Sequence, residues 1–444
     1  MKKYDEYKDS GVEWIGEVPS HWEVVKIKQV CKNEKYAIKT GPFGTQLKGQ
    51  ELQPEGDVVV YNQRNVIDNS FDNVQFYVTK EKAKSLSSFY TKPGDILVTS
   101  RGTIGRAAIL EGKYPMGILH PCLIAIRLNE NKCLQKWLMT YVNETNCFKT
   151  DVTLSSNATT IDVIYTETLK NIAIPIPPLY EQQTIATYLD KKCGEIDKVI
   201  SAQQKRIALL QELKQSIITH AVTKGLDPNV EMKDSGVEWI GKVPKHWEVM
   251  KTSLAFHGIG SGTTPSTSKP EFYNEETGKY WLQTGDLNDG VITDTSKKVT
   301  ELAIKTCNLK SYPKDSVVIA MYGATIGKVG ILGITSATNQ ACCVLPKSKN
   351  MSSKYAFYEF LACKPALLVS AIGGGQPNIS QDTIKKQKIV VPPFTEQQTI
   401  ATYLDKKCAS IDSSISKAQH QVALLQEYKQ SLITEVVTGK RKVC

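Results

Sequence analysis

The sequence predicts an α+β protein in which two similar mixed α/β domains are separated by two long antiparallel helices, all related by an internal pseudo-two-fold repeat. Three observations predict this architecture. The segment EQQTIATYLDKKC occurs at 181–193 and again, letter for letter, at 396–408. The segment KDSGVEWIG also occurs twice, at 8–16 and at 233–241. The sequences between these copies are almost unrelated, so a domain-sized unit has been duplicated and its interior has diverged.

The offsets between the copies set the predicted domain limits. The helical segment recurs after 215 residues (396 − 181) and KDSGVEWIG after 225 (233 − 8), so the first interior is about ten residues longer. Each interior has roughly 150 residues, which is enough to bury a core of its own. The predicted parts are an opening segment (1–22), a first mixed domain (23–178), a central region with the first helix (179–247), a second mixed domain (248–393) and a C-terminal region with the second helix (394–444).

Apolar residues spaced by threes, fours and sevens predict one long helix over 181–222 and another over 396–437. Paired prolines at 177–178 and 392–393 come just before the two helices, where proline suits a helix start. The residues predicted to pack the helices are Ile185, Leu189, Ile196, Leu210 and Ile217 in the first copy, and Ile400, Leu404, Ile411, Leu425 and Leu432 in the second.

Each predicted helix spans about 60 Å, and an apolar stripe of that length needs a partner. Because the second interior returns the chain to the start of the second helix, an antiparallel pair with one domain at each end is the natural arrangement. Such a pair is either a purely structural bundle or a rigid spacer that fixes the distance between the two domains.

Short runs rich in β-forming residues predict strands in both interiors. The sequence at 93–110 is weakly echoed at 313–332, and Ile164 and Leu169 match Ile379 and Ile384 at the 215-residue offset. The two interiors are therefore expected to share one fold and to differ at their surfaces. The predicted strands lie within 57–61, 94–99 and 119–127 in the first interior, and within 279–282, 315–321 and 341–345 in the second.

Composition is typical of a soluble globular protein, with 41% hydrophobic and 23% charged residues. The net charge of +10 modestly favours a nucleic-acid partner. Eleven cysteines without a CxxC pair are typical of reduced thiols, and neither a secretion signal nor a membrane span is predicted. A cytoplasmic protein without a membrane partner is expected.

No motif predicts catalysis, a metal site or a cofactor on this chain. Pro-Pro-Phe at 392–394 lacks the polar residue that an adenine methyltransferase places before it, and helix entry explains the prolines better. The glycines at 323 and 327 are one residue too close for a phosphate loop, and Val329 replaces the Ser or Thr that would hold magnesium. His21 and His246 belong to a repeated Pro-x-His-Trp segment, where packing with Trp22 and Trp247 is favoured over catalysis.

Polar and basic segments rich in glycine recur in both interiors. Arg, Lys, Gln and Asn can read base edges, whereas Gly, Ser and Thr let the backbone approach phosphates. For any single residue the alternative is an ordinary solvated loop. The candidate DNA-binding residues are Lys39, Gln46, Arg64, Arg101 and Arg106 in the first interior, and Lys269, Gln283, Lys328, Gln376 and Asn378 in the second.

The repeated GVEWIG and VPxHWE segments, the doubled PPxxEQQxIAxYLD helix starts and the two diverged interiors resemble the specificity subunit of type I restriction-modification systems over essentially the whole chain. The resemblance implies that each mixed domain is a target recognition domain that reads one half of a bipartite, asymmetric DNA site. It also implies that the helices are an antiparallel spacer and that the repeated parts dock methyltransferase subunits.

The resemblance further implies a prokaryotic complex with two methyltransferase subunits and two restriction subunits, acting in DNA methylation and phage defence. Those partners would use S-adenosylmethionine, ATP and magnesium, and this chain would be non-catalytic. Two alternatives stay open from the residues alone. One is a stand-alone DNA methyltransferase or nuclease, which needs a cofactor motif, and the other is a coiled-coil scaffold that binds no DNA.

Overall fold

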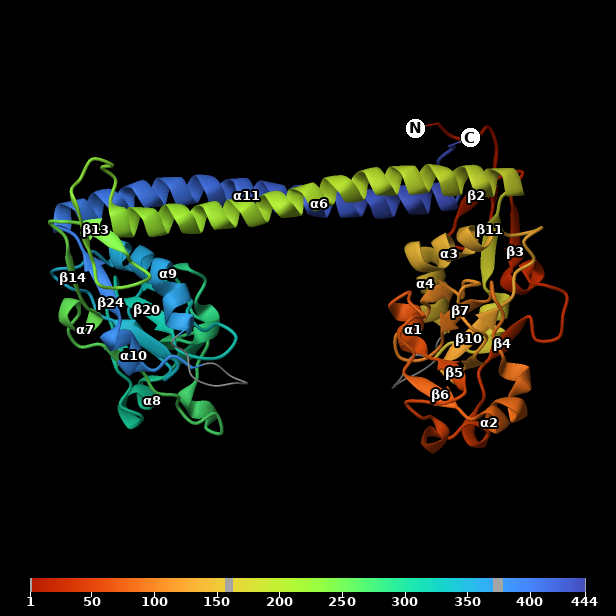
Figure 1. The fold of residues 1–444 in the computed structure, drawn as a ribbon, viewed down its shortest axis with the longest axis horizontal. Helices are drawn as coiled ribbons and strands as arrows, with labels where there is room; N and C mark the ends of the chain where they lie inside the picture. The colour runs from red at the N-terminus through yellow and green to blue at the C-terminus, as the bar shows by residue number, and fades with distance from the viewer. Residues whose placement is uncertain (1, 156–162, 370–377, 444) are drawn as a thin grey trace. The chain divides into compact units, whose positions relative to one another are not determined.

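A computed structural model describes residues 2–155, 163–369 and 378–443 (Figure 1). The chain forms two compact units, one made of residues 1–203 with 421–444 and the other of residues 204–420. The division falls within both long helices, so each unit combines one mixed domain with half of each helix. The predicted domain limits stay predictions, since contacts divide the chain in this different way.

Unit 1 contains a four-stranded antiparallel sheet of order β4-β10-β7-β8 and a three-stranded sheet of order β6-β5-β9. Two further strand pairs, β1-β2 and β11-β3, lie towards the helices (Figure 1). The elements are β1 (Tyr7–Asp9), β2 (Glu17–Pro19), β3 (Glu23–Lys26), β4 (Ile38–Thr40), β5 (Val58–Tyr61), α1 (Gln63–Ile67), β6 (Phe76–Val78), α2 (Lys80–Ser85), β7 (Ile96–Thr99), β8 (Ala107–Ile109), β9 (Ile118–Leu119), β10 (Leu123–Ile126), α3 (Gln135–Glu144), α4 (Asn146–Ser155), α5 (Thr166–Asn171), β11 (Ala173–Ile176) and α6 (Leu179–Lys224), which continues into unit 2.

Unit 2 repeats this plan with the sheets β15-β23-β20-β21-β17 and β18-β16-β22-β19, and with the pairs β12-β13 and β14-β24. Strands β17 and β19 are additions at the sheet edges. The elements are β12 (Met232–Asp234), β13 (Lys242–Pro244), β14 (Glu248–Lys251), α7 (Thr252–Ala255), β15 (Gly260–Ser261), β16 (Lys279–Leu282), β17 (Gly290–Ile292), β18 (Lys297–Val299), α8 (Glu301–Thr306), β19 (Ser311–Tyr312), β20 (Val317–Ala320), β21 (Val329–Leu332), β22 (Ser336–Thr338), β23 (Cys342–Leu345), α9 (Ser353–Val369), α10 (Gln381–Lys386), β24 (Lys388–Val391) and α11 (Phe394–Val437), whose last part belongs to unit 1.

The predicted strands are confirmed with one correction. Strands β7, β10, β20 and β23 are buried along their whole length, as continuous apolar runs require. The run predicted at 119–127 is two strands in different sheets, because β9 pairs with β5 whereas β10 pairs with β7. The chain turns between them at 120–122, where His120 Nδ1 accepts a hydrogen bond from the Cys122 amide at 3.2 Å.

The two long helices are confirmed and begin two residues earlier than predicted, at Leu179 and Phe394. In unit 1 the start of α6 packs with the end of α11, and Lys429 pairs with Asp197 at 2.7 Å. In unit 2 the same ion pair, displaced by 215 residues, joins Lys214 to Asp412 at 2.8 Å. Pairs this exposed stabilise little, but the repeated pair shows that the helices run antiparallel in both units.

Most of the residues predicted to pack the helices are buried. Ile185, Leu189, Ile196, Ile400, Leu404, Ile411 and Leu432 are buried, and Leu210, Ile217 and Leu425 are half-buried. Beside Ile217, the fully buried residue is Ile218. Figure 1 shows that α3 lies between α6 and the sheet of unit 1, and that α9 takes the matching place in unit 2.

Each helix ends on a glycine that packs against the tryptophan of a repeated Pro-x-His-Trp segment. Gly225 has φ +79° and an added Cβ would lie 3.1 Å from Trp247, whereas Gly439 has φ +75° and an added Cβ would lie 2.2 Å from Pro19. Both positions therefore need glycine. In unit 1 this closure joins the two chain ends, because Tyr7 donates to the Gly439 carbonyl at 3.2 Å and the Lys442 amide donates to the Lys2 carbonyl at 3.0 Å.

A buried carboxyl group lies in the core of unit 2. Glu359 on α9 is fully buried, and its Oε1 accepts a hydrogen bond from the Val390 amide of β24 at 2.8 Å. Burial raises the pKa of Glu359 from 4.5 to about 8. Tyr141 of α3 stands at the matching place of unit 1 and donates to the Ala173 carbonyl at 3.4 Å. At this place unit 2 therefore carries a buried carboxyl group where unit 1 carries a tyrosine.

Stability of unit 2 should fall as the pH rises from about 5 to 8, because the unfolded chain ionises at Glu359 while the folded unit does not. Because the pKa of Glu359 is raised in the folded unit, the loss of stability is absent below the unfolded pKa of 4.5 and complete above the folded pKa of about 8. The expected slope is about 1.4 kcal/mol per pH unit. Glu359→Gln should flatten it, as measured by hydrogen exchange of α9 peptides at several pH values. Tyr141→Phe is the control and should leave the slope unchanged; equal slopes for wild type and Glu359→Gln would contradict the assignment.

Candidate nucleic-acid interface and helix-start clusters

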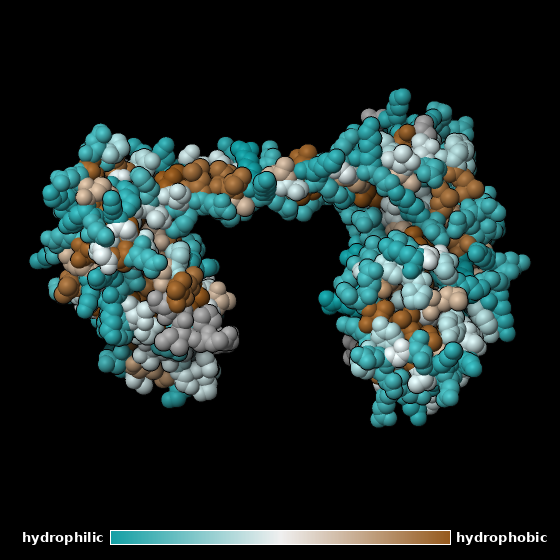
Figure 2. Space-filling model, viewed as in Figure 1, coloured by the Kyte–Doolittle hydropathy of each residue, from teal (hydrophilic) through white to brown (hydrophobic). Residues whose placement is uncertain are grey.

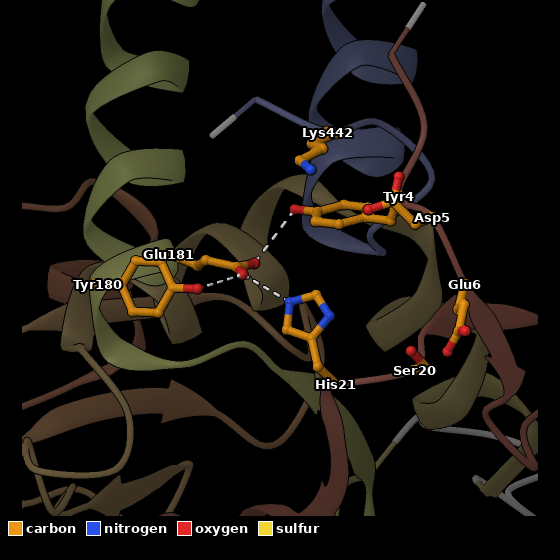
Figure 3. A pocket seen from close by; sticks show the side chains of 8 residues that line it. All are labelled: Tyr4, Asp5, Glu6, Ser20, His21, Tyr180, Glu181 and Lys442. Atoms are coloured by element: carbon orange, nitrogen blue, oxygen red, sulfur yellow. Dashed lines mark hydrogen bonds and ion pairs between the residues drawn. The ribbon is translucent and has the colours of Figure 1, made fainter.

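The start of α6 is tied to the opening segment by one buried carboxylate (Figure 3). Glu181 accepts a hydrogen bond from Trp22 Nε1 at 2.8 Å, and His21 Nε2 lies 2.6 Å from the same carboxylate. The hydroxyls of Tyr4 and Tyr180 also donate to it, at 3.3 and 3.1 Å. The Glu181 side chain is only 5% exposed, so these donors replace the water that a buried carboxylate loses.

Unit 2 repeats the core of this cluster with fewer donors. Glu396 accepts from Trp247 Nε1 at 2.8 Å, and His246 Nε2 lies 2.8 Å away. The Glu396 side chain is 42% exposed, and Thr395 stands where the first copy has Tyr180. The histidines thus share a carboxylate with the tryptophans in addition to the predicted packing. The sequence does not reveal this partner, because His21 and Glu181 are 160 positions apart in the chain.

The cavity beside Glu181 has a volume of about 590 Å³ and is lined by acidic, basic and phenolic side chains. Figure 3 shows the Lys442 and Tyr4 side chains at its upper edge and Ser20 and Glu6 at its lower edge. Ser20, His21 and Glu181 are the residue types of a nucleophilic triad. However, Lys245 replaces Ser20 in the repeated segment, so a triad is no part of the repeat.

The next residue of each helix, a glutamine, holds the preceding loop in place. Gln182 accepts from the Leu134 amide at 2.8 Å and donates to the carbonyls of Lys132 and Pro177. Gln397 makes the same three bonds in unit 2, to Ser352, Asn350 and Pro392. Both glutamines are fully buried, so their identity in the two copies follows from internal packing.

For other residues that are identical in the two helices, internal packing does not explain the identity. A second repeated stretch, ALLQE at 208–212 and 423–427 followed by KQS at 214–216 and 429–431, was overlooked from the sequence. Its lysines make the interhelical ion pairs, but Leu209 and Leu424 are 55% and 50% exposed. In the first repeated block the exposed identical pairs are Gln183 and Gln398, Thr184 and Thr399, Thr187 and Thr402, and Lys191 and Lys406.

Both mixed domains build the same glycine turn at the end of a buried strand. In unit 1 the turn runs from Arg101 to Arg106 after β7, and in unit 2 from Tyr322 to Lys328 after β20, one residue longer. The turn glycines have positive φ in both units: Gly102 and Gly105 in the first, Gly323 and Gly327 in the second. The weak sequence echo between the interiors therefore marks a shared backbone turn.

Four backbone hydrogen bonds repeat around this turn. In unit 1 they join Thr99 to Arg106, Gly105 to Thr99, Ser100 to Cys122 and Ile164 to Ser100, over 2.8 to 2.9 Å. In unit 2 they join Ala320 to Lys328, Gly327 to Ala320, Met321 to Ala341 and Ile379 to Met321, over 2.7 to 2.9 Å. An adjacent turn is shared too, because His120 Nδ1 and Asn339 Oδ1 each accept from the amide two residues on, at 3.2 Å.

In unit 1 the predicted DNA-binding residues fall into two groups. Arg101 and Arg106 lie on the glycine turn, and the Arg101 guanidinium lies over the exposed ring of Phe43, with 4.7 Å from Cζ to the ring centre. The other three have local roles. Lys39 donates to the Ser88 carbonyl at 2.6 Å, Gln46 accepts from the Phe43 amide at 3.1 Å, and Arg64 pairs with Asp68 at 2.6 Å. Burial, followed by the charge of Arg127, lowers the pKa of Lys39.

In unit 2, Lys328 ends the glycine turn and Asn378 forms an isolated β-bridge with Tyr322, the first residue of that turn. Gln283 is half-buried where β16 ends, and exposed Lys269 lies 5.2 Å from the Phe272 ring centre. Gln376 lies outside the described residues. The sequence prediction does not include Phe43, His120 and Gln340, because their proximity to the turns depends on the fold.

The family model for the type I restriction modification DNA specificity domain matches residues 19–209 and 244–420, once over each half of the chain. The chain belongs to this family. The two matches, like the two units, reflect one specificity domain present twice.

Two relatives in this specificity-domain family match along most of their length. The chain is 27% identical over 442 residues to the putative type I restriction enzyme MjaX specificity subunit of Methanocaldococcus jannaschii, covering 97% of this chain and 96% of the relative. It is 21% identical over 393 residues to the type I restriction enzyme EcoKI specificity subunit of Escherichia coli K12, covering 85% and 81%.

Solved structures share the fold at low identity. A chain from a structure described as the basis of complex assembly and conformational transition of the type I R-M system matches with a TM-score of 0.72 at 16% identity, covering 95% of this chain and 98% of that one. The HsdS subunit from Thermoanaerobacter tengcongensis matches with a TM-score of 0.55 at 16% identity, covering 96% and 98%.

Among residues 2–155, 163–369 and 378–443, no group of three or more His, Cys, Asp or Glu side chains is placed to hold a metal ion. No helix in these ranges is long and apolar enough to cross a membrane.

Glu181→Ala should destabilise unit 1 by about 1–3 kcal/mol, because it leaves the fully buried Trp22 indole N–H without its acceptor. Glu396→Ala should cost less, since that carboxylate is more exposed and water can take its place. Thermal unfolding followed by tryptophan fluorescence would compare the two variants. Glu181→Gln keeps an acceptor and serves as the control; a cost for Glu396→Ala equal to or above that for Glu181→Ala would contradict this ranking.

Proposed function

We propose that this chain is the specificity subunit of a type I restriction-modification complex, in which each mixed domain reads one half of a bipartite, asymmetric DNA site. The observation that carries the proposal is that both units keep the same turns and the same helix-start cluster while the side chains displayed by the turns differ. Two different readers on one repeated frame suit two different half-sites. The helix pair sets the separation of the half-sites.

The proposed contacts with DNA come from the basic and polar turns. The candidates are those predicted from the sequence, with Arg101, Arg106, Lys328 and Asn378 supported by their place on or beside the repeated glycine turn. The net charge of +10 agrees with a polyanionic partner. Lys39 is the weakest candidate, because its ammonium group is bound to a carbonyl and covered by two aromatic rings.

In the proposed complex, catalysis is carried out by other subunits. Two methyltransferase subunits would use S-adenosylmethionine, and two restriction subunits would use ATP and magnesium, all in the prokaryotic cytoplasm. The chain supplies sequence recognition and a frame. This agrees with the failed methyltransferase and phosphate-loop motifs at 391–394 and 323–329.

The exposed identical residues of the helices are the proposed docking surface for the methyltransferase subunits. Unit 1 carries Gln183, Thr187 and Lys191 on α6 together with Leu424 on α11, and unit 2 carries their repeats. Figure 2 shows apolar patches on the helix pair among hydrophilic side chains. Since internal packing does not require these identities, an identical partner on each unit accounts for them.

Leu209→Asp and Leu424→Asp should each lower the number of bound methyltransferase subunits from two to one, and the double variant should bind none. Native mass spectrometry of the co-purified complex would count them. Val199 is the matched control, because it is similarly exposed at 46% but its repeat position is Ser414. Val199→Asp should keep both partners; full occupancy in the double leucine variant would remove these leucines from the docking surface.

The function itself is tested by mapping methylated adenines across the source genome with and without this gene. Loss of one bipartite motif upon deletion is the expected result. Methylation of DNA by the purified chain with S-adenosylmethionine alone would favour a stand-alone methyltransferase. An unchanged methylome, together with no duplex binding at low salt in the presence of the partner subunits, would favour a scaffold without DNA recognition.

A further inference from the structure

The shared turns allow positions in the two domains to be compared one by one. Arg101 directly follows Ser100, whose amide donates to the Cys122 carbonyl in the adjacent turn, and Tyr322 directly follows Met321, whose amide donates to the Ala341 carbonyl. Arg101 and Tyr322 also each form an isolated β-bridge, with Val163 and Asn378 respectively. Pro121 and Gln340 are the middle residues of the adjacent turns. Arg106 and Lys328 are the last residues of the glycine turns and make equivalent backbone bonds. The first two positions change chemistry between the domains, whereas the third keeps its positive charge.

Resting on the proposed function, we propose that Arg101 reads a guanine in one half-site, that Gln340 reads an adenine in the other, and that Arg106 and Lys328 bind phosphates. A residue that reads a base must differ between two domains that recognise different sequences. A residue that binds the backbone needs only to stay cationic, because phosphates are the same in every sequence.

The surroundings of Arg101 suit a base reader. Arg64 and Arg127 pair with carboxylates, whereas the Arg101 guanidinium lies over the exposed ring of Phe43. Stacking on an aromatic ring holds the planar guanidinium in one orientation and does not use its edge donors. Two parallel donors on one plane match the O6 and N7 acceptors of guanine.

His120 is the first residue of the adjacent turn. Burial, followed by the charge of Arg101, lowers the pKa of His120. Because its Nδ1 accepts from the Cys122 amide, the ring proton is on Nε2. The imidazole therefore supports the turn without adding a charge that would repel Arg101.

In unit 2 the displayed groups are amides and hydroxyls. Gln340 is exposed, and its Oε1 accepts from the Thr264 hydroxyl, which comes from the loop after β15. This contact restricts the amide, and an oriented glutamine amide matches the N6 and N7 atoms of adenine. No cation takes the place of Arg101 on this turn, so domain 2 is not expected to read guanine there.

The test uses the full chain in complex with its methyltransferase subunits and a duplex library randomised over both half-sites. Arg101→Lys keeps the positive charge but loses the two parallel N–H donors of the guanidinium, so discrimination at one base pair of one half-site should fall roughly 10- to 100-fold. Gln340→Leu should do the same at one base pair of the other half-site only. Arg106→Gln should weaken binding to all sequences alike and reduce the slope of log K against log salt by about 0.9.

Lys26→Gln is the matched charge control, because Lys26 is exposed on β3, where it pairs with Ala173 of β11 and is no part of the glycine turn. It should leave both discrimination and salt slope unchanged. If wild type selects a bipartite site but Arg101→Lys keeps full discrimination or weakens all sequences equally, Arg101 is not a base reader and the proposed function still stands. If the wild-type complex selects no sequence, the proposed function fails first.

Discussion

The fold depends on one constraint, which is that two long helices must bury their apolar faces without a core of their own. Each helix meets this constraint in two ways, by packing on the antiparallel partner and by packing on a mixed domain. Ile185 and Leu189 join the core of unit 1, and Ile400 and Leu404 join that of unit 2. Since burying each such side chain contributes roughly 1.5–3 kcal/mol, helices and domains stabilise each other.

The beginnings of the helices are where this mutual support is most specific. The strand that leads into each helix, β11 or β24, pairs with the strand that opens the same domain, β3 or β14. Directly beyond these pairs, the Trp-Glu hydrogen bond joins the opening segment to the first helical turn. The domain is thus closed at its base, whereas the shared glycine turns follow the buried strands β7 and β20.

Some residues that are identical in the two copies are buried, and others are exposed, and duplication explains both groups. Gln182 and Gln397 repeat because the same three backbone groups need the same amide, whereas Leu209 and Leu424 repeat although both are exposed. In unit 1 the segments 2–7 and 439–442 join beside Glu181, whereas one continuous segment, 224–230, lies beside Glu396 in unit 2. Glu181 is also more deeply buried than Glu396.

The sequence by itself determined the two-fold repeat, both helices and most strands, because apolar periodicity and exact repetition are local signals. It also determined the family. Only the tertiary structure decided that 119–127 is two strands, that His21 shares a carboxylate with Trp22, and that Arg101 stacks on Phe43. Those facts depend on contacts between residues far apart in the chain. Lys39 and Arg101 look alike in the sequence, and only their neighbours in space separate a lysine held by a carbonyl from an arginine that lies over the exposed ring of Phe43.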